Sequence, residues 1–274
     1  MSIVAALAAS HAPGITGWPE SAPPDQAGRF LKAFEGLGER LSASRPDVLI
    51  VLTPEHWVNF FLNNMPAFCV GIGDSFAGPA EEPAWLKIPR ATIPGAPKQA
   101  RALFREMSRE IDLAFSEELA LDHGAMVPLH FLAPQMDLPV IPIFINCLTH
   151  PLPPLQRCHR MGQVLGELVR AWPERVALIA TGGLSHWPGM PQAGKINVEF
   201  DLRFLQAITE GRSEEFARYA DEAIEAEAGP GAHEIRTWLA VAAAVRGMKG
   251  EVFAYEAVQA WATGCAIAAF SGAG

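Results

Sequence analysis

The stretch 47-DVLIVLTPEHW-57 decides the class of fold. Five apolar residues follow one another in Val48–Leu52, which is typical of a strand buried on both faces of a parallel sheet. Pro54 ends this strand, and His56 stands two residues further on. Ligands of open α/β sheets bind outside the carboxyl ends of the strands. We therefore expect an α/β fold in which His56 lies at the edge of the sheet where a site forms.

The same alternation extends along the chain. Strand-like runs lie at Ile3–Ala9, Val48–Leu52, Ala67–Ile72, Val140–Ile145, Val176–Ala180, Glu251–Ala254 and Cys265–Phe270. Helical patterns lie at Gln26–Ser42, Pro97–Glu110, Pro154–Trp172, Asn197–Gly211, Ser213–Asp221 and Ala232–Arg246. Strands that alternate with helices predict a single α/β domain over residues 1–274, with a mostly parallel central sheet flanked by helices. The last two strands could add an antiparallel edge.

The composition is that of a globular enzyme or binding protein. Half of the 274 residues are hydrophobic and 19% are charged, which is enough apolar material for a sizeable core. The net charge is −9 and no cluster of Lys and Arg occurs. Because the phosphates of a nucleic acid need a basic face, these features exclude nucleic acid as an expected partner.

Three features predict a cytoplasmic protein with no membrane partner. The first residues, MSIVAALAASHAPG, lack a basic segment, so we expect a buried strand rather than a signal peptide. No stretch approaches the roughly 18 apolar residues of a membrane helix. The four cysteines, Cys69, Cys147, Cys158 and Cys265, show no CxxC pairing, which favours buried thiols in a reducing compartment.

Three of the eight histidines stand just beyond strand-like runs. His11 follows the first run, His56 the second, and His186 the run Val176–Ala180 through the glycine-rich turn 180-ATGGLSH-186. Parallel strands deliver such residues to one edge of the sheet. We therefore expect these imidazoles to share one site, and a metal is the ligand that they favour.

The remaining histidines differ in their local context. Asp122 is placed to cap a helix that begins near His123, so His123 is either an exposed residue at a helix end or a group that contacts substrate. His130 falls on a similar helical face and is expected in the core or behind the site. His150 and His159 lie in loop and helix-surface contexts, where no site role is expected.

A carboxylate could complete a metal site. Glu234 begins a very apolar helix, where an acidic residue is also favoured by the helix dipole alone. Two histidines and one carboxylate form the facial triad of non-haem Fe(II) sites.

Glu199 and Asp201 are rival carboxylates, although both are expected to be solvated or salt-bridged. His233 is expected to face elsewhere on the helix. Glu55, next to His56, is expected behind the site or in solvent, because neighbours in extended chain point to opposite sides.

A zinc hydrolase is the main alternative on chemical grounds, since three histidines also suit zinc. The sequence contains neither HExxH nor the GxSxG nucleophile motif, however. The common hydrolase signatures are therefore missing.

With these motifs assembled, the sequence resembles the class III extradiol ring-cleaving dioxygenases, in particular catalytic β subunits of the protocatechuate 4,5-dioxygenase type. The matching segments, in order, are 10-SHAPGI-15, 47-DVLIVLTPEHW-57, 121-LDHGAMVPL-129, 145-INCLTHPLPP-154, 180-ATGGLSHWPGMPQAGKIN-197 and 233-HEIRTWL-239. They cover most of the chain. The resemblance implies that His11, His56 and Glu234 bind Fe(II), with Mn(II) as an alternative. It further implies that His186 is the active-site acid and base and that His123 contacts the substrate.

One departure from the family pattern concerns the residues before the second histidine ligand. The family usually has an Asn-Asp pair there, and this chain has Pro54 and Glu55. The resemblance keeps the ligand but leaves its supporting contacts open, and such contacts tune metal affinity.

The resemblance implies that the enzyme cleaves a small catecholic acid, of the protocatechuate or gallate kind, with O₂. A dihydroxypyridine or an aminophenol ring is the alternative substrate, and a non-catalytic binding relative is a further reading. Loops 12–24 and 73–96 are expected to wall the site, with Lys87 or Arg90 as guesses for a carboxylate partner. We expect either a homo-oligomer or a small α-type subunit that covers the site.

Overall fold

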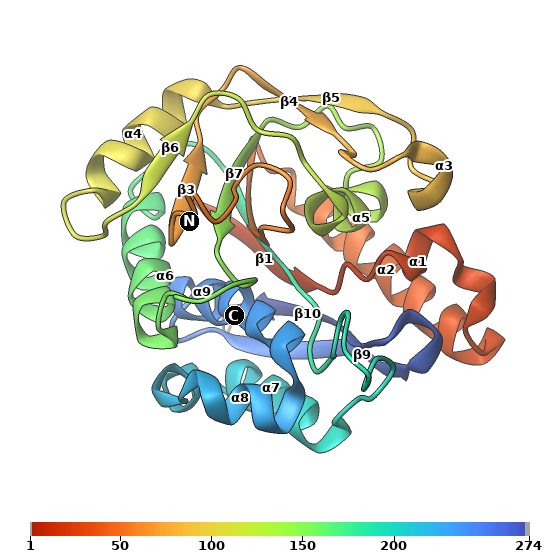
Figure 1. Cartoon of the computed structure of the whole chain (residues 1–274). Helices are drawn as coiled ribbons and strands as arrows, with labels where there is room; N and C mark the ends of the chain where they lie inside the picture. Colours follow the sequence, from red (N-terminus) through yellow and green to blue (C-terminus); the bar gives the residue numbers. More distant parts are fainter. Residues whose placement is uncertain (1, 272–274) are drawn as a thin grey trace.

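An eight-stranded sheet forms the centre of the computed structural model, which describes residues 2–271 (Figure 1). Its strands are β1 (Ile3–Ala9), β2 (Val48–Pro54), β3 (Phe68–Gly71), β6 (Ala114–Ser116), β7 (Val140–Ile145), β8 (Val176–Thr181), β9 (Lys249–Val258) and β10 (Thr263–Ser271). Their order across the sheet is β6-β3-β7-β2-β8-β1-β10-β9. A separate two-stranded sheet contains β4 (Ser75–Gly78) and β5 (Ala91–Pro94).

The four central strands, β7, β2, β8 and β1, run parallel to one another. Every residue of β2, β7 and β8 is buried, as the unbroken apolar runs predict. Strands β10 and β9 extend the sheet antiparallel to β1, and β3 lies antiparallel to β7. The predicted α/β fold, its mostly parallel centre and its antiparallel addition are therefore confirmed.

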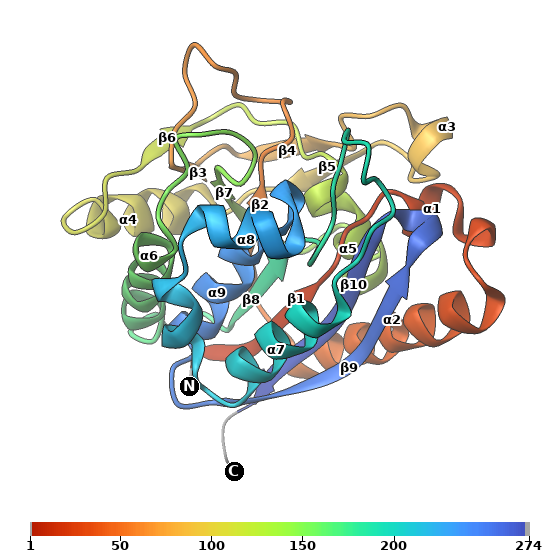
Figure 2. The same cartoon turned by 60° about the horizontal axis from the view of Figure 1, so that its bottom comes forward.

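Helices cover both faces of this sheet. The α-helices are α1 (Gly14–Gly17), α2 (Pro24–Ser44), α3 (Pro83–Leu86), α4 (Pro97–Met107), α5 (His123–Leu132), α6 (Leu155–Val169), α7 (Val198–Thr209), α8 (Asp221–Ala228) and α9 (Ile235–Ala244). Short 3₁₀ helices are η1 (Pro19–Ser21), η2 (Ser213–Arg218), η3 (Pro230–Glu234) and η4 (Gln259–Trp261). Apolar residues of α4, α6, α7 and α9 pack on one face, and those of α2 and α5 on the other. Figures 1 and 2 show the two groups on either side of the sheet.

The sequence-based boundaries fail mainly at short elements. The segment predicted as a helix at Ser213–Asp221 is the 3₁₀ helix η2, and α8 begins at Asp221. The predicted loop 73–96 contains β4, α3 and β5, and strand β6 was not predicted. The four elements β4, α3, β5 and β6 are three or four residues long, so their sequences show too little periodicity to be recognised locally. Their pairing with distant segments stabilises them.

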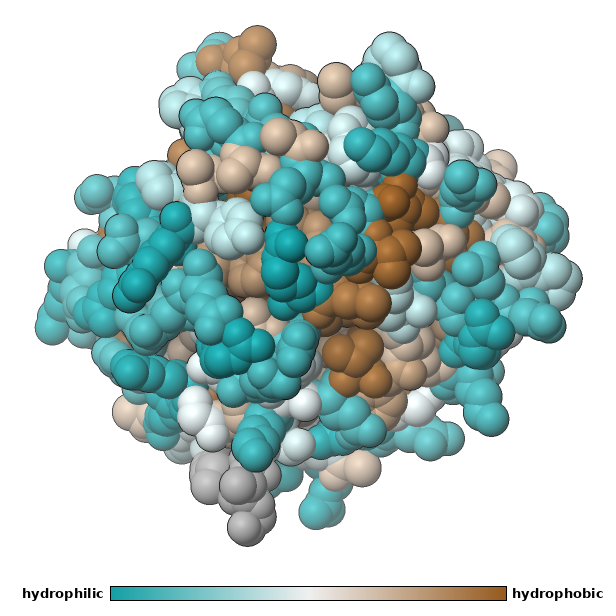
Figure 3. All heavy atoms as spheres, turned by 90° about the horizontal axis from the view of Figure 1, so that it is seen from below, coloured by the Kyte–Doolittle hydropathy of each residue, from teal (hydrophilic) through white to brown (hydrophobic). Residues whose placement is uncertain are grey.

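Three further features bear on function. All four cysteines are free and buried, as expected. Within residues 2–271, no helix combines the length and the apolar character needed to cross a membrane. The face that carries α7, α8 and β9 is mostly hydrophilic but is crossed by an apolar stripe (Figure 3). Val198 and Leu202 of α7 and Val252 of the edge strand β9 are exposed.

Candidate active site

The carboxyl ends of the central parallel strands meet at one cavity. Strands β1, β2 and β8 end two to five residues before His11, His56 and His186, and all three histidines line it. The cavity has a volume of about 420 Å³. Its walls also include His123, Glu234, Pro13, Cys147, Leu148, Pro188, Pro230 and Trp261. The structure therefore brings together the five residues that the sequence singled out.

Two imidazoles converge on one carboxylate within this cavity. His11 Nε2 lies 3.2 Å from Glu234 Oε2, and His56 Nε2 lies 3.3 Å from Glu234 Oε1. All three side chains are largely buried. Burial alone raises the pKa of a carboxyl group, but the nearby His11 and His186 hold the pKa of Glu234 well below its usual range. Glu234 therefore offers an ionised carboxylate to whatever binds beside the two Nε2 atoms.

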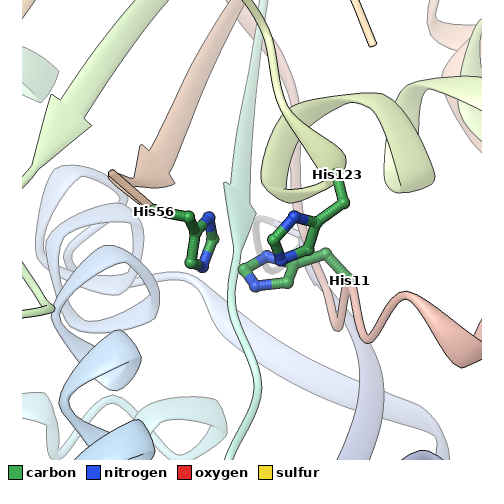
Figure 4. Close-up of side chains that lie close together, drawn as sticks. All are labelled: His11, His56 and His123. Carbon is green, nitrogen blue, oxygen red and sulfur yellow. The ribbon is translucent and has the colours of Figure 1, made fainter. Parts of the chain in front are cut away.

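His123 adds a third imidazole to this cluster. Figure 4 shows its ring, which descends from α5, beside those of His11 and His56. One nitrogen of each ring lies within 4.8 Å of the others. The ring centroids of His56 and His123 are 4.2 Å apart. The structure thus places His123 at the cavity itself, where a group bound beside the carboxylate would contact it.

Asp122 orients His56. Its Oδ2 accepts a hydrogen bond from His56 Nδ1 at 2.9 Å, while its Oδ1 accepts from the backbone N–H of Gly124 at 2.8 Å. The predicted helix cap is confirmed, and the bond to His56 is a second role that local sequence did not indicate. Burial raises the pKa of Asp122, but attraction to His56 outweighs it and lowers that pKa to about 2. The carboxylate keeps the proton of His56 on Nδ1, so Nε2 is the atom that faces Glu234.

His186 has its own fixed orientation. Its Nδ1 donates to the carbonyl oxygen of Leu184 at 2.8 Å, and its Nε2 lies 3.7 Å from Glu234 Oε1. The ring packs directly on Gly231, where an added Cβ would overlap it. A bonded Nδ1 leaves Nε2 with its lone pair directed at the cavity. His186 can therefore accept a proton at Nε2.

Asp201 holds the turn that carries His186. Its Oδ1 accepts from the Ser185 backbone N–H at 2.8 Å, and its Oδ2 accepts from Ser185 Oγ and Tyr255 OH, each at 2.8 Å. Asp201 is fully buried, so the expectation of a solvated residue was wrong. Burial raises its pKa, although these bonds oppose the rise. The helix pattern alone could not reveal the burial, because β9 and the 182–186 turn cover this face of α7.

Glu81 is a site residue that sequence reasoning missed. Its Oε1 accepts from His123 Nδ1 at 2.6 Å and from the His123 backbone N–H at 3.0 Å. Burial raises the pKa of Glu81, but these hydrogen bonds outweigh it and the net pKa is lowered. Glu81 lies in the loop between β4 and α3, 42 residues before its partner, and no local signal marks it.

Glu55 is buried, so of its two predicted places, behind the site or in solvent, the structure excludes solvent. Its Oε1 accepts from the backbone N–H groups of Val58 and Asn59 at 2.6 and 2.7 Å. Glu55 therefore organises the turn after His56. The ring of His56 is oriented by Asp122 and not by Glu55.

Two histidines form a second cluster outside the cavity lining. His150 Nε2 and His233 Nε2 both lie within 2.9 Å of Glu225 Oε1. The Nδ1 of His233 accepts from the buried guanidinium of Arg236, however, so its Nε2 must carry the proton. A protonated nitrogen cannot bind a metal, and this cluster is a structural hydrogen-bond network. His150 and His233 thus lie outside the cavity, as predicted.

The remaining histidines and the two basic residues suggested for a carboxylate all lie outside the cavity lining. His130 is half-buried on α5 and does not line the cavity. His159 is buried against Ser213 Oγ rather than on a helix surface, because η2 folds over α6. Lys87 and Arg90 do not line the cavity, and they lie near the surface carboxylates of Glu20 and Glu82. Among the described residues, no Lys or Arg lines the cavity.

The side chains at this cavity fit a divalent cation. Imidazole nitrogen and carboxylate oxygen together are the donors of mononuclear Fe(II) sites, and they also suit Mn(II) and zinc. The Nε2 atoms of His11 and His56 face the two oxygens of one ionised carboxylate. A histidine binds a metal through a ring nitrogen that carries no proton, so Nε2 of His11 and of His56 would release any proton that it carries when the ion binds.

The fold and the site together define an open α/β protein with a candidate metal centre at the carboxyl ends of its strands, and comparison with known proteins specifies its family. Residues 5–266 match the family described as the catalytic LigB subunit of aromatic ring-opening dioxygenase, so the chain belongs to this family. The predicted extradiol ring-cleaving activity on a catecholic substrate with O₂ is thereby confirmed, as is dependence on a metal.

Similar proteins carry more specific names. A 2,3-dihydroxyphenylpropionate/2,3-dihydroxicinnamic acid 1,2-dioxygenase of Klebsiella pneumoniae subsp. pneumoniae is 28% identical, with 93% of this chain and 94% of that protein covered. A protein of the same name from Escherichia coli K12 is 29% identical, with 82% and 86% covered. The crystal structure of an uncharacterized protein from Escherichia coli K12 shares the fold, with a TM-score of 0.63 and 16% identity over 96% of this chain and 98% of that one.

Proposed function

We propose that His11, His56 and Glu234 bind Fe(II), with Mn(II) as the alternative metal. The observation that carries this proposal is the convergence of two histidine Nε2 atoms on one buried carboxylate at 3.2 and 3.3 Å. A bound Fe(II) would supply open coordination positions for a vicinal diol and O₂ and a redox centre between the ring and oxygen. Asp122 supports this set by holding His56 in the tautomer that ligates through Nε2.

We propose that His186 is the general base and acid of the reaction. Its Nδ1 is committed to the Leu184 carbonyl oxygen, so Nε2 takes the proton of a substrate hydroxyl. The same nitrogen later returns a proton to an oxygen of the opening ring. Gly231 and the hydrogen bonds of Asp201 hold the His186 ring in one orientation. A base held in a reactive orientation loses less entropy on reaching the transition state.

His123 is the second histidine that contacts the substrate. Its ring lies 5.3 Å from that of His11 and 4.2 Å from that of His56, centroid to centroid, so it borders the space beside both proposed ligands. Cleavage then occurs beside the diol rather than between its hydroxyls, and it gives a ring-opened semialdehyde-type product.

For the substrate, we propose a small catecholic acid. Protocatechuate- and gallate-like rings are the first candidates, and the relatives' names add 2,3-dihydroxyphenylpropionate. A dihydroxypyridine or an aminophenol is the alternative. Because Pro13, Leu148, Pro230 and Trp261 make apolar walls, the hydrocarbon part of the substrate contacts them. The acid group points to the rim near the exposed Pro188, where water solvates it.

We also propose that residues 1–274 act as one catalytic domain, either as a homo-oligomer or with a small α-type subunit over the site. Exposed apolar side chains on α7 and β9, together with the outer edge of β9, which pairs with no strand within residues 2–271, favour self-association (Figure 3). Light scattering on the purified protein tests this, and a monomer that is fully active alone contradicts it.

The decisive experiment measures oxygen uptake. The protein is purified without air, loaded with Fe(II) and offered protocatechuate, gallate, 2,3-dihydroxyphenylpropionate, unsubstituted catechol, a dihydroxypyridine and an aminophenol. We expect one O₂ to be consumed per ring cleaved, with a yellow product. Inactivity on the whole panel at full iron loading refutes the proposed function, and activity that follows zinc rather than iron refutes the metal.

A further inference from the structure

Glu81 and His123 form a largely buried pair at the cavity wall. One carboxylate oxygen, Oε1, accepts both the ring Nδ1–H at 2.6 Å and the backbone N–H at 3.0 Å. The side chains of His123 and Glu81 are only 15% and 19% exposed. A hold on both the ring and the backbone of one residue fixes the direction in which its side chain leaves α5.

The contact also selects the tautomer of His123. A neutral imidazole carries its proton on one nitrogen, and a carboxylate cannot donate, so the proton lies on Nδ1. Nε2 is then the only ring nitrogen left for a partner in the cavity. Turning the ring by half a turn would exchange this 2.6 Å bond for a C–H contact, and the neighbouring ring of His56 confines it on another side.

Two neighbouring residues at the start of α5, Asp122 and His123, thus belong to two different carboxylate–histidine pairs. Asp122 reaches across to His56, while its neighbour His123 is held by Glu81. The first pair supports a proposed metal ligand, and the second supports an imidazole that faces the substrate. The two pairs share no hydrogen bond, so each can be perturbed separately.

The second carboxylate oxygen of Glu81 indicates that this residue has a role other than stabilising the fold. Oε2 is buried, and it accepts no hydrogen bond from the described part of the chain. An unsatisfied buried polar atom costs free energy, so a purely structural residue would not be expected to carry one.

We propose that Glu81 is a positioning residue that holds His123 in the Nδ1–H tautomer with Nε2 directed at the substrate. This inference rests on the proposed function, because it takes His123 as a substrate contact. Glu81 itself touches neither the proposed ligands nor the substrate, and it acts only through His123.

The first test reads the tautomer directly and needs no turnover. Long-range ¹H–¹⁵N spectra of the protein labelled on histidine are recorded for the wild type, Glu81→Gln and Glu81→Ala, with His123→Ala to assign the signals. We expect the Nδ1–H pattern for His123 in the wild type and in Glu81→Gln, whose amide oxygen still accepts. Glu81→Ala should shift the signal toward the Nε2–H form. An unchanged tautomer in Glu81→Ala overturns the proposal.

The second test is a double-mutant cycle on the iron-loaded enzyme. Glu81→Ala should lower kcat by at least about tenfold while iron content and Tm stay unchanged, and Glu81→Gln should recover most of the loss. In the His123→Ala background, replacing Glu81 should change kcat by less than about twofold, because the two residues act as one unit. Glu82→Gln is the matched control, since Glu82 is exposed and should leave kcat unchanged.

The outcomes separate this inference from the proposed function. Equal losses of kcat from Glu81→Ala in both backgrounds overturn the inference, as does a loss of iron or of Tm that accounts for the activity lost. If the wild type cleaves no diol, the proposed function fails, and the tautomer measurement still decides whether Glu81 positions His123.

Discussion

Helices α6 and α9 approach each other so closely that one methyl group added at a glycine of α6 should push them apart. Gly162 and Gly166 of α6 face the backbone carbonyl oxygens of Ala240 and Ala244, and a Cβ added at either glycine would lie well inside 3.0 Å of its carbonyl. Backbone cannot rotate aside as a side chain can. The substitution Gly162→Ala therefore forces the two helices apart by about 1 Å.

The expected loss of stability is the difference between two effects. Overpacking a close contact costs about 1–3 kcal/mol, and a clash with backbone lies at the upper end. Replacing glycine by alanine inside a helix returns about 1 kcal/mol. Gly162→Ala should thus lower the free energy of unfolding by about 2 kcal/mol, which lowers Tm by roughly 4–8 °C at 2–4 °C per kcal/mol.

The matched control has the opposite sign. Gly28 lies on α2 with no heavy atom within 4 Å of an added Cβ, so Gly28→Ala should raise stability by about 0.5–1 kcal/mol. Circular dichroism on thermal unfolding measures both. Because α9 begins directly after Glu234, Gly162→Ala should also lower activity, whereas Gly28→Ala should not. If Gly162→Ala proves as stable as Gly28→Ala, the close helix contact does not exist as described.

Four further outcomes follow from the site. His11→Ala should lose iron, whereas His186→Ala should keep iron and lose turnover; normal iron content in His11→Ala, measured by elemental analysis, contradicts the ligand assignment. Gly231→Ala should displace the His186 ring and lower kcat at least about tenfold with iron retained, which steady-state oxygen uptake checks. Asp201→Asn should cost about 1–3 kcal/mol in urea unfolding, because an amide cannot accept the hydrogen bonds from the Ser185 turn as a carboxylate does. Removing the metal with EDTA should lower Tm, since a ligand present at 100 times its Kd contributes about 2.7 kcal/mol, and an unchanged Tm would speak against a tightly bound ion.

Much of the architecture could be predicted because it depends on local pattern. The runs Ile3–Ala9, Val48–Leu52 and Val176–Ala180 are continuous and apolar, and buried parallel strands have this pattern whatever surrounds them. Parallel strands end at a shared edge, so the common location of His11 and His186 also followed. Short elements such as β6 escaped prediction, since three residues show no period.

The carboxylates were harder to predict. In one dimension, Asp201 resembles a solvated residue of an amphipathic helix, and Glu81 is one acid among several in a loop. Their partners lie 16 and 42 residues away, and burial is decided by the segments that pack over them. The same holds for the bond between His56 and Asp122, which spans 66 residues.

The sequence by itself therefore determined the class of fold, the edge of the sheet where the site lies and the histidines that reach it, because strand length, burial and strand-end position are properties of local order. Only the tertiary structure decided which nitrogen of each histidine faces the cavity. A tautomer depends on which acceptor stands beside the other nitrogen. For His56 and His123 these acceptors, Asp122 and Glu81, lie 66 and 42 residues away in the chain, and for His186 the acceptor is the nearby carbonyl oxygen of Leu184, which the fold of the turn brings to Nδ1.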